Sequence, residues 1–149
     1  QRVLSFVESA RQDGAKLLTG GQRPSGADFR RGYWIQPTVY GDVTMDMRVA
    51  REEIFGPILS ILKWRTQEEA IAMANATEYG LTAGVWTHDL KLAMSFVRAI
   101  QSGFVYVNTT ARHFVGTPFG GWKNSGLGRE ECLEELLSYT QNKAIHIFV

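Results

Sequence analysis

The first residues that could do chemistry are two adjacent glutamates, Glu52 and Glu53, followed closely by Phe55 and a Gly56–Pro57 turn. Neighbouring carboxylates repel each other, and a rigid turn beside them would fix where each one points. A carboxylate here can accept hydrogen bonds from sugar hydroxyls, while an aromatic ring can lie against a flat ligand. The alternative is a solvated helix end followed by a phenylalanine of the core. The pattern alone favours that alternative.

A second candidate is the glycine-rich stretch from Pro118 to Glu130, which also carries Lys123. A phosphate-binding loop would place lysine directly after its last glycine and before a serine or threonine. Here Lys123 precedes Ser125, and a long loop replaces the strand that should precede the glycines of a dinucleotide fingerprint. Both motifs are therefore rejected. We expect the glycines to allow tight turns beside Phe119 and Trp122.

Cys132 is the only cysteine, and four glutamates surround it in the segment from Glu130 to Glu135. Nearby carboxylates disfavour the thiolate form, so a nucleophilic role is not expected. We expect Cys132 to be a partly buried helix residue instead. A lone cysteine cannot form an internal disulfide, which predicts a reducing, cytoplasmic setting.

The histidines His88, His113 and His146 are scattered, and no further ligand lies at the spacing of a metal site, so no bound metal is expected. Arg112 and His113 are the exception among these polar residues. They lie in a long loop after an expected strand at 104–107, and α/β sheets contact ligands at such carboxyl ends. Both are candidates for ligand contact, although at least half of the residues in such loops have no specific role.

The elements that must position these residues follow an α/β pattern. We expect apolar strands at 58–62, 83–86 and 104–107, with helices at about 67–76 and 90–100 between them. Thr66 with Glu69 fits a capping box for the first helix, and Asp89 can cap the second. This order predicts a pair of βαβ units with parallel strands and helices on the faces of the sheet.

The two ends of the chain are less regular than its centre. Elements expected there are a helix from about Val3 to Gln12, a strand at 15–19, helical turns at 45–52, a short helix at 130–137 and a terminal strand at 143–149. Residues 33–35 also lead into a strand-like stretch, which Pro37 should confine to a sheet edge or a bulge. The terminal strand is apolar at alternate positions and has no turn to fold it back. Such a strand is expected to pair with another chain.

The composition is that of an ordinary globular domain, with 44% hydrophobic and 21% charged residues. Lysine plus arginine number 16 against 15 for aspartate plus glutamate, which indicates neither a nucleic-acid nor an anionic-membrane partner. No apolar run reaches the roughly 18 residues of a membrane-spanning helix. The chain opens on Gln1 within a helix-like repeat, so we expect it to be part of a longer protein without a signal peptide here.

Several motifs in order resemble the aldehyde dehydrogenase superfamily over essentially the whole chain. The motifs that carry the resemblance are Glu52–Pro57, Asn75 with Tyr79–Leu81, Gly103–Asn108 and Pro118–Glu130. The stretch from Arg112 to Gly116 is similar to that of betaine-aldehyde-type members. The resemblance implies an α/β fold: the parallel-sheet βαβ core of the catalytic domain, incomplete over 1–140, followed by an oligomerisation strand over 141–149.

The resemblance also implies site residues. In the family, the glutamate that matches Glu53 binds the nicotinamide-ribose hydroxyls of NAD or NADP, and the phenylalanine that matches Phe55 packs near the nicotinamide. That implication reverses the preference drawn from the pattern alone. The loop from Thr109 to Phe119 matches the segment that lines the aldehyde entrance. Residues expected to select the substrate are Thr110, Arg112, His113 and Phe119.

The implied activity is the oxidation of an aldehyde to a carboxylic acid through a cysteine thiohemiacetal and thioester. In the family, the reactive cysteine, the general-base glutamate and an oxyanion-hole asparagine lie upstream of anything in this sequence. None of these roles passes to Cys132, so no catalytic residue is assigned and the chain is expected to be inactive alone. Implied partners are an aldehyde, a missing N-terminal cofactor domain and further copies in a dimer or tetramer.

One alternative is a stand-alone binding or assembly module that reuses this fold without catalysis. A start codon directly before Gln1 in the coding sequence would favour that alternative. A third possibility, a nucleotide-binding domain without enzymatic activity, is disfavoured by the missing phosphate loop.

Overall fold

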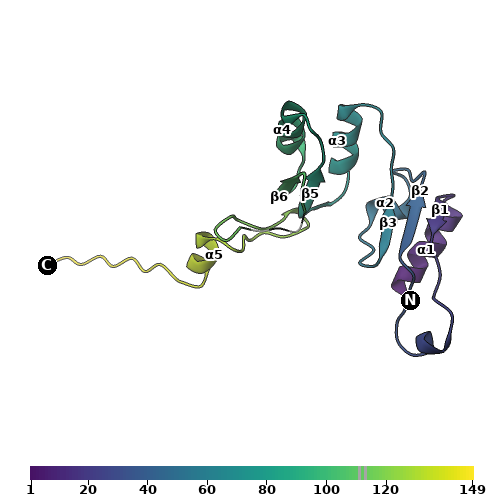
Figure 1. Ribbon diagram of the computed structural model, residues 1–149. Coiled ribbons are helices and arrows are strands. Elements are labelled where there is room, and N and C mark those ends of the chain that lie inside the picture. Colours follow the sequence, from purple (N-terminus) through teal and green to yellow (C-terminus); the bar gives the residue numbers. More distant parts are fainter. Residues whose placement is uncertain (111, 113) are drawn as a thin grey trace. The chain divides into compact units, whose positions relative to one another are not determined.

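The structure, a computed structural model, describes residues 1–110, 112 and 114–149 (Figure 1). The chain divides into two compact units, Gln1–Thr77 and Glu78–Val149. Within the described residues, no helix combines the length and apolar character needed to cross a bilayer. The predicted boundary at 140/141 between a catalytic domain and a terminal strand stays a prediction.

A three-stranded sheet forms the centre of the first unit. Strand β2 (Thr38–Gly41) lies between β1 (Lys16–Thr19), to which it is antiparallel, and β3 (Ile58–Ser60), to which it is parallel. The strands predicted near 15–19 and 58–62 are confirmed. The strand-like stretch expected after 33–35 is β2, whose pairing begins after Pro37, where the Thr38 amide donates to the Pro57 carbonyl at 2.9 Å. The expected edge position is wrong, because Pro37 precedes the strand and β2 lies between β1 and β3.

The core of the first unit lies between the sheet and two helices. Helix α1 (Arg2–Gln12) places the fully buried Phe6 and Ala10 against Tyr40 of β2. Helix α2 (Arg48–Arg51) and a 3₁₀ turn at Ala27–Phe29 complete this part of the chain. Because α1 and α2 pack together, the segment that follows α2 begins on a rigid base.

Helix α3 (Gln67–Asn75) begins as the sequence predicts, with one difference. The Glu69 amide donates to the Thr66 hydroxyl at 3.2 Å, which is the capping bond expected. The Glu69 carboxylate accepts from the Arg65 amide at 2.7 Å, one residue before the partner of a standard capping box. The turn that leads into α3 is therefore held from both sides.

The second unit contains the βαβ motif that the sequence predicts. Strands β5 (Thr82–Val85) and β6 (Phe104–Val107) pair in parallel, and helix α4 (Leu90–Ala99) connects them. The Asp89 carboxylate caps α4 by accepting from the Leu92 amide at 3.0 Å. This second βαβ unit is confirmed.

The first predicted βαβ unit needs correction. Strand β3 pairs with β2, and β5 pairs with β6, so among the described residues β3 and β5 belong to different sheets. The physical reason is that β2 provides β3 with its parallel partner, in the register Thr38↔Ile58. Sequential strands are neighbours often but not always.

The glycine-rich stretch after β6 folds back over that unit. Strand β7 (Trp122–Lys123) pairs antiparallel with β4 (Tyr79–Gly80), and helix α5 (Leu133–Ser138) follows. Residues 141–149 are exposed and make no strand pairing with any described part of the chain. A strand needs a partner for its hydrogen bonds, so the predicted oligomerisation strand stays a prediction.

Candidate functional site

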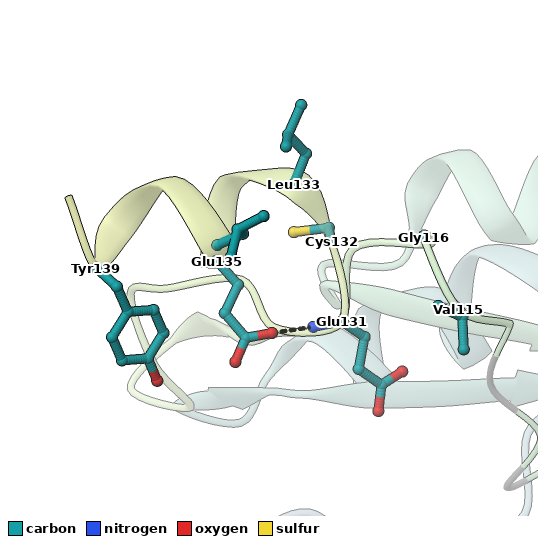
Figure 2. Close-up of a pocket in the computed structure, with 8 residues that line it drawn as sticks. Val115, Gly116, Glu131, Cys132, Leu133, Glu135 and Tyr139 are labelled. Atoms are coloured by element: carbon teal, nitrogen blue, oxygen red, sulfur yellow. Dashed lines mark hydrogen bonds between the residues drawn. The ribbon is translucent and has the colours of Figure 1, made fainter.

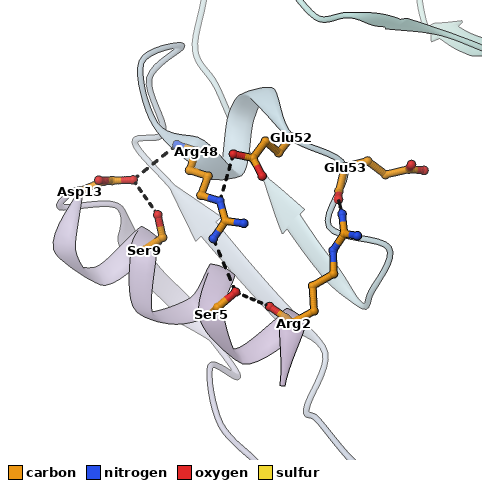
Figure 3. A network of polar contacts seen from close by, with 7 residues as sticks. All are labelled: Arg2, Ser5, Ser9, Asp13, Arg48, Glu52 and Glu53. Carbon is orange, nitrogen blue, oxygen red and sulfur yellow. Dashed lines mark hydrogen bonds and ion pairs between the residues drawn. The ribbon is translucent and has the colours of Figure 1, made fainter. Parts of the chain in front are cut away.

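The two adjacent glutamates have different surroundings (Figure 3). The Glu52 carboxylate accepts from the Arg48 Nε at 3.0 Å, and this hydrogen bond holds the pKa of Glu52 below its ordinary value. The Glu53 main-chain carbonyl accepts from the Arg2 guanidinium at 2.7 Å. The exposed Glu53 carboxylate makes no hydrogen bond or ion pair with any described residue and points away from the network in Figure 3. Only one carboxylate of the pair is left for a ligand.

The aromatic ring beside these glutamates is exposed rather than buried. Phe55 is 86% exposed and adopts a φ of 53°, in the left-handed region. The turn around it is fixed, because the Ile58 amide donates to the Gly56 carbonyl at 2.8 Å. A Cβ added at Gly56 would lie 2.8 Å from Val3 of α1, so the turn also packs closely on that helix. Phe55 therefore does not belong to the core of the first unit.

Asn108 controls how the predicted substrate loop leaves β6. Its amide donates to the Val85 carbonyl at 2.8 Å, and its φ is 54°. Its side chain accepts from the Thr87 amide at 2.8 Å and donates to the Thr87 carbonyl at 2.9 Å. The side chain therefore continues the parallel ladder beyond the end of the strands while the backbone turns away.

The predicted substrate residues are not brought together by any contact in the described structure. Thr110 and Arg112 are exposed in the loop after Asn108, and His113 lies outside the described residues. The Phe119 ring packs against Phe104 with centroids 5.6 Å apart, and its backbone is bridged to the next part of the loop. Their roles in substrate selection stay predictions.

Cys132 lies at the start of α5, at the edge of a hollow of about 670 Å³ (Figure 2). The Glu131 amide donates to the Glu135 carboxylate at 2.7 Å and braces the entry to the helix. The pKa of Glu134 lies below its ordinary value because its own backbone amide and the Cys132 thiol hydrogen-bond to the carboxylate. Cys132 is partly buried, as predicted, and directly precedes the first residue of α5.

The sequence predicts no metal, and the part of the chain that the structure describes holds no group of three His, Cys, Asp or Glu side chains placed to bind one. Sequence reasoning missed two residues that shape the site, Arg2 and Arg48, and noted Asn108 only as the end of a family motif. The spacing of Arg48 and Glu52, four residues apart, could have revealed their ion pair. The contact between Arg2 and Glu53 spans 51 residues and leaves no local signal.

The pattern that defines the Aldehyde dehydrogenase family matches residues 1–145. This chain belongs to the aldehyde dehydrogenase family. It is 46% identical to the aldehyde dehydrogenase tropH of Talaromyces stipitatus over 98% of this chain and 29% of that protein. The chain thus spans less than a third of the length of this curated relative. The resemblance inferred from the motifs is confirmed.

Solved structures of aldehyde dehydrogenases superpose closely on the chain. The Mycobacterium tuberculosis enzyme complexed with NAD+ gives a TM-score of 0.87 at 44% identity, covering 94% of this chain and 28% of that one. The NAD-dependent enzyme from Sinorhizobium meliloti gives 0.89 at 44% identity, over 98% and 28%. A Staphylococcus aureus betaine aldehyde dehydrogenase in complex with NAD+ gives 0.88 at 35% identity, over 93% and 27%. The α/β fold class is therefore confirmed.

Proposed function

We propose that this chain forms the nicotinamide-ribose side of the cofactor site in an NAD(P)-dependent aldehyde dehydrogenase that oxidises an aldehyde to a carboxylic acid. One observation carries the proposal: the Glu53 carboxylate, which has no partner among the described residues, belongs to a fixed turn that also carries the exposed ring of Phe55, two positions later in the chain. A carboxylate can accept hydrogen bonds from two ribose hydroxyls, and a flat apolar surface on the same turn suits the aromatic ring joined to that ribose. The relatives solved in complex with NAD+ support a nicotinamide dinucleotide as the cofactor.

In this proposal the residues of the chain bind and orient. The Glu53 carboxylate accepts hydrogen bonds from the ribose hydroxyls, and the Phe55 ring lies against the nicotinamide. When bound, the nicotinamide supplies the hydride acceptor. Substrate is selected at the loop that carries Thr110, Arg112, His113 and Phe119. Sequence outside this chain supplies the cysteine that forms the thiohemiacetal and thioester, together with the general base. The chain alone is therefore expected to be inactive.

The same proposal covers assembly and location. Residues 1–140 form an incomplete catalytic domain that joins an N-terminal cofactor domain, while 141–149 pair with a second copy in a dimer or tetramer. The exposed apolar side chains of Ile145, Ile147 and Phe148 support this pairing. The single cysteine supports a cytoplasmic location.

The proposal is tested in the full-length protein with Glu53→Gln, which keeps the shape of the side chain and removes its charge. A hydrogen bond to a charged group contributes about 1.5–3 kcal/mol, so the dissociation constant for NAD+ should rise about tenfold or more. Calorimetric titration with NAD+ measures it. The matched control is Glu68→Gln, an exposed glutamate on α3 that should leave the constant unchanged.

Two results would contradict this proposal. The first is an unchanged affinity for NAD+ in the Glu53→Gln protein. The second is NADH production by the 149-residue chain alone when it is mixed with NAD+ and a panel of aldehydes, because that would place the reactive groups within this sequence.

A further inference from the structure

Two arginines from two helices reach the segment that carries the acidic pair (Figure 3). Arg2, in the first turn of α1, donates to the Glu53 carbonyl at 2.7 Å. Arg48, at the start of α2, donates to the Glu52 carboxylate at 3.0 Å. One arginine therefore holds the main chain of one glutamate, and the other holds the side chain of its neighbour.

Arg48 is held more firmly than an ordinary surface arginine. Its guanidinium lies 4.0 Å from the centre of the Phe6 ring, which is fully buried, and its side chain is only 38% exposed. Exposed ion pairs contribute little by themselves, because two long side chains must be ordered. Stacking on a rigid ring of the core removes part of that cost. Glu52 therefore has a fixed partner.

Arg2 occupies a place where a cation gains nothing from its own helix. The N-terminal end of a helix carries a partial positive charge, which disfavours an arginine in the first turn. The guanidinium of Arg2 instead donates a hydrogen bond to the Glu53 carbonyl. The Ser5 hydroxyl donates to the main-chain carbonyl of Arg2 at 2.7 Å. This contact ties the residue before the Ile54–Pro57 turn to α1.

We propose that Arg2 and Arg48 are positioning residues for Glu53. Arg48 neutralises Glu52 and keeps that carboxylate out of the cofactor site, while Arg2 fixes the backbone from which the Glu53 side chain projects. The Glu53 carboxylate alone is then presented to the ribose hydroxyls. This inference rests on the proposed function.

The test uses the full-length protein and three substitutions that each keep a long apolar side chain: Arg2→Met, Arg48→Met and, as control, Arg11→Met. Arg11 lies on the same helix as Arg2 but pairs with Glu8, one turn away, at 2.6 Å. Arg2→Met and Arg48→Met should each weaken NAD+ binding about three- to tenfold, the effect of one net hydrogen bond. The kcat at saturating substrate should stay near the parent value, and Arg11→Met should change neither quantity. Arg48→Lys should recover part of the lost affinity.

A second set of variants separates positioning from a general structural effect. In the Glu53→Gln background, Arg2→Met should weaken NAD+ binding no further, because the group it positions has lost its charge. The same fold-loss in both backgrounds would overturn the inference. So would NAD+ affinities for Arg2→Met and Arg48→Met equal to that of Arg11→Met, while Glu53→Gln binds more weakly and the proposed function stands. If Arg48→Met does not fold, the exposed Arg2 decides the outcome.

Discussion

Replacing Gly103 by alanine should loosen the loop that follows Phe119. A Cβ at Gly103 would collide with the carbonyl of Gly120, far inside the 3.0 Å below which real Cβ atoms are essentially never found. The obstacle is backbone, so no side-chain rotation can relieve it. The Gly103 amide is also tied to the Gly80 carbonyl at 2.9 Å on its other side. The loop must therefore move by more than about 1 Å to relieve the collision.

The magnitude follows from the cost of an overpacked contact. Extra atoms in a well-packed site typically cost about 1–3 kcal/mol, and a backbone obstacle should place Gly103→Ala at the upper end. A loss of about 3 kcal/mol corresponds to local opening roughly a hundredfold more frequent. Hydrogen exchange of the full-length protein, followed at the amides of residues 119–128, measures this opening directly.

Gly128→Ala is the matched control, because a Cβ there would meet nothing within 4 Å and its backbone is not left-handed. Exchange in the Gly128→Ala protein should stay close to that of the parent. Equal protection of the 119–128 amides in the two variants would show that the Gly103–Gly120 approach does not restrain the loop.

Two further predictions concern Asn108 and Glu52. Asn108→Asp keeps the acceptor for the Thr87 amide but places a carboxylate oxygen against the Thr87 carbonyl. The free energy of unfolding should therefore fall by about 1–3 kcal/mol, and limited proteolysis should cleave the 109–119 loop faster. Asn108→Gly keeps the left-handed backbone and is the control for the turn itself. The pKa of Glu52 is held down by its hydrogen bond to Arg48, so Arg48→Met should return it toward the ordinary glutamate value in an NMR titration. A carboxyl whose pKa is lower in the folded state than in the unfolded state stabilises the fold above the unfolded-state pKa, and this stabilisation is lost as the pH falls through the folded-state pKa. The difference in unfolding free energy between the parent and Arg48→Met should therefore narrow in acid. A difference that stays constant with pH would contradict this prediction.

The part of the fold that could be predicted from the sequence is the part encoded locally. Strand β5, helix α4 and strand β6 follow from apolar runs, the Asp89 cap and the glycine at position 103. The sheet partner of β3 could not be predicted in this way, because the register of β2 with β3 depends on residues twenty positions apart. Strand pairing over such distances is set by packing that no short pattern records.

The candidate site divides in the same manner. The exposed carboxylate of Glu53 agrees with both interpretations of the acidic pair, and the exposed Phe55 ring does not belong to the core of the first unit; the cofactor role of both residues stays a prediction. The pattern failed there because apolar residues are usually buried, and a phenylalanine on the surface is the exception. The ion pair of Arg48 with Glu52 could have been found from its spacing of four residues, but the contact of Arg2 with Glu53 could not, since it joins residues 51 positions apart.

At Phe55, the residue that best suits the left-handed backbone differs from the residue that ligand binding needs. Glycine adopts that conformation without the penalty of about 1 kcal/mol that other residues incur. Selection for thermal stability alone would therefore favour Phe55→Gly, which removes the aromatic side chain of the turn. The resulting variant would be more stable but would bind the cofactor more weakly, so Phe55 should be kept unchanged when the protein is stabilised.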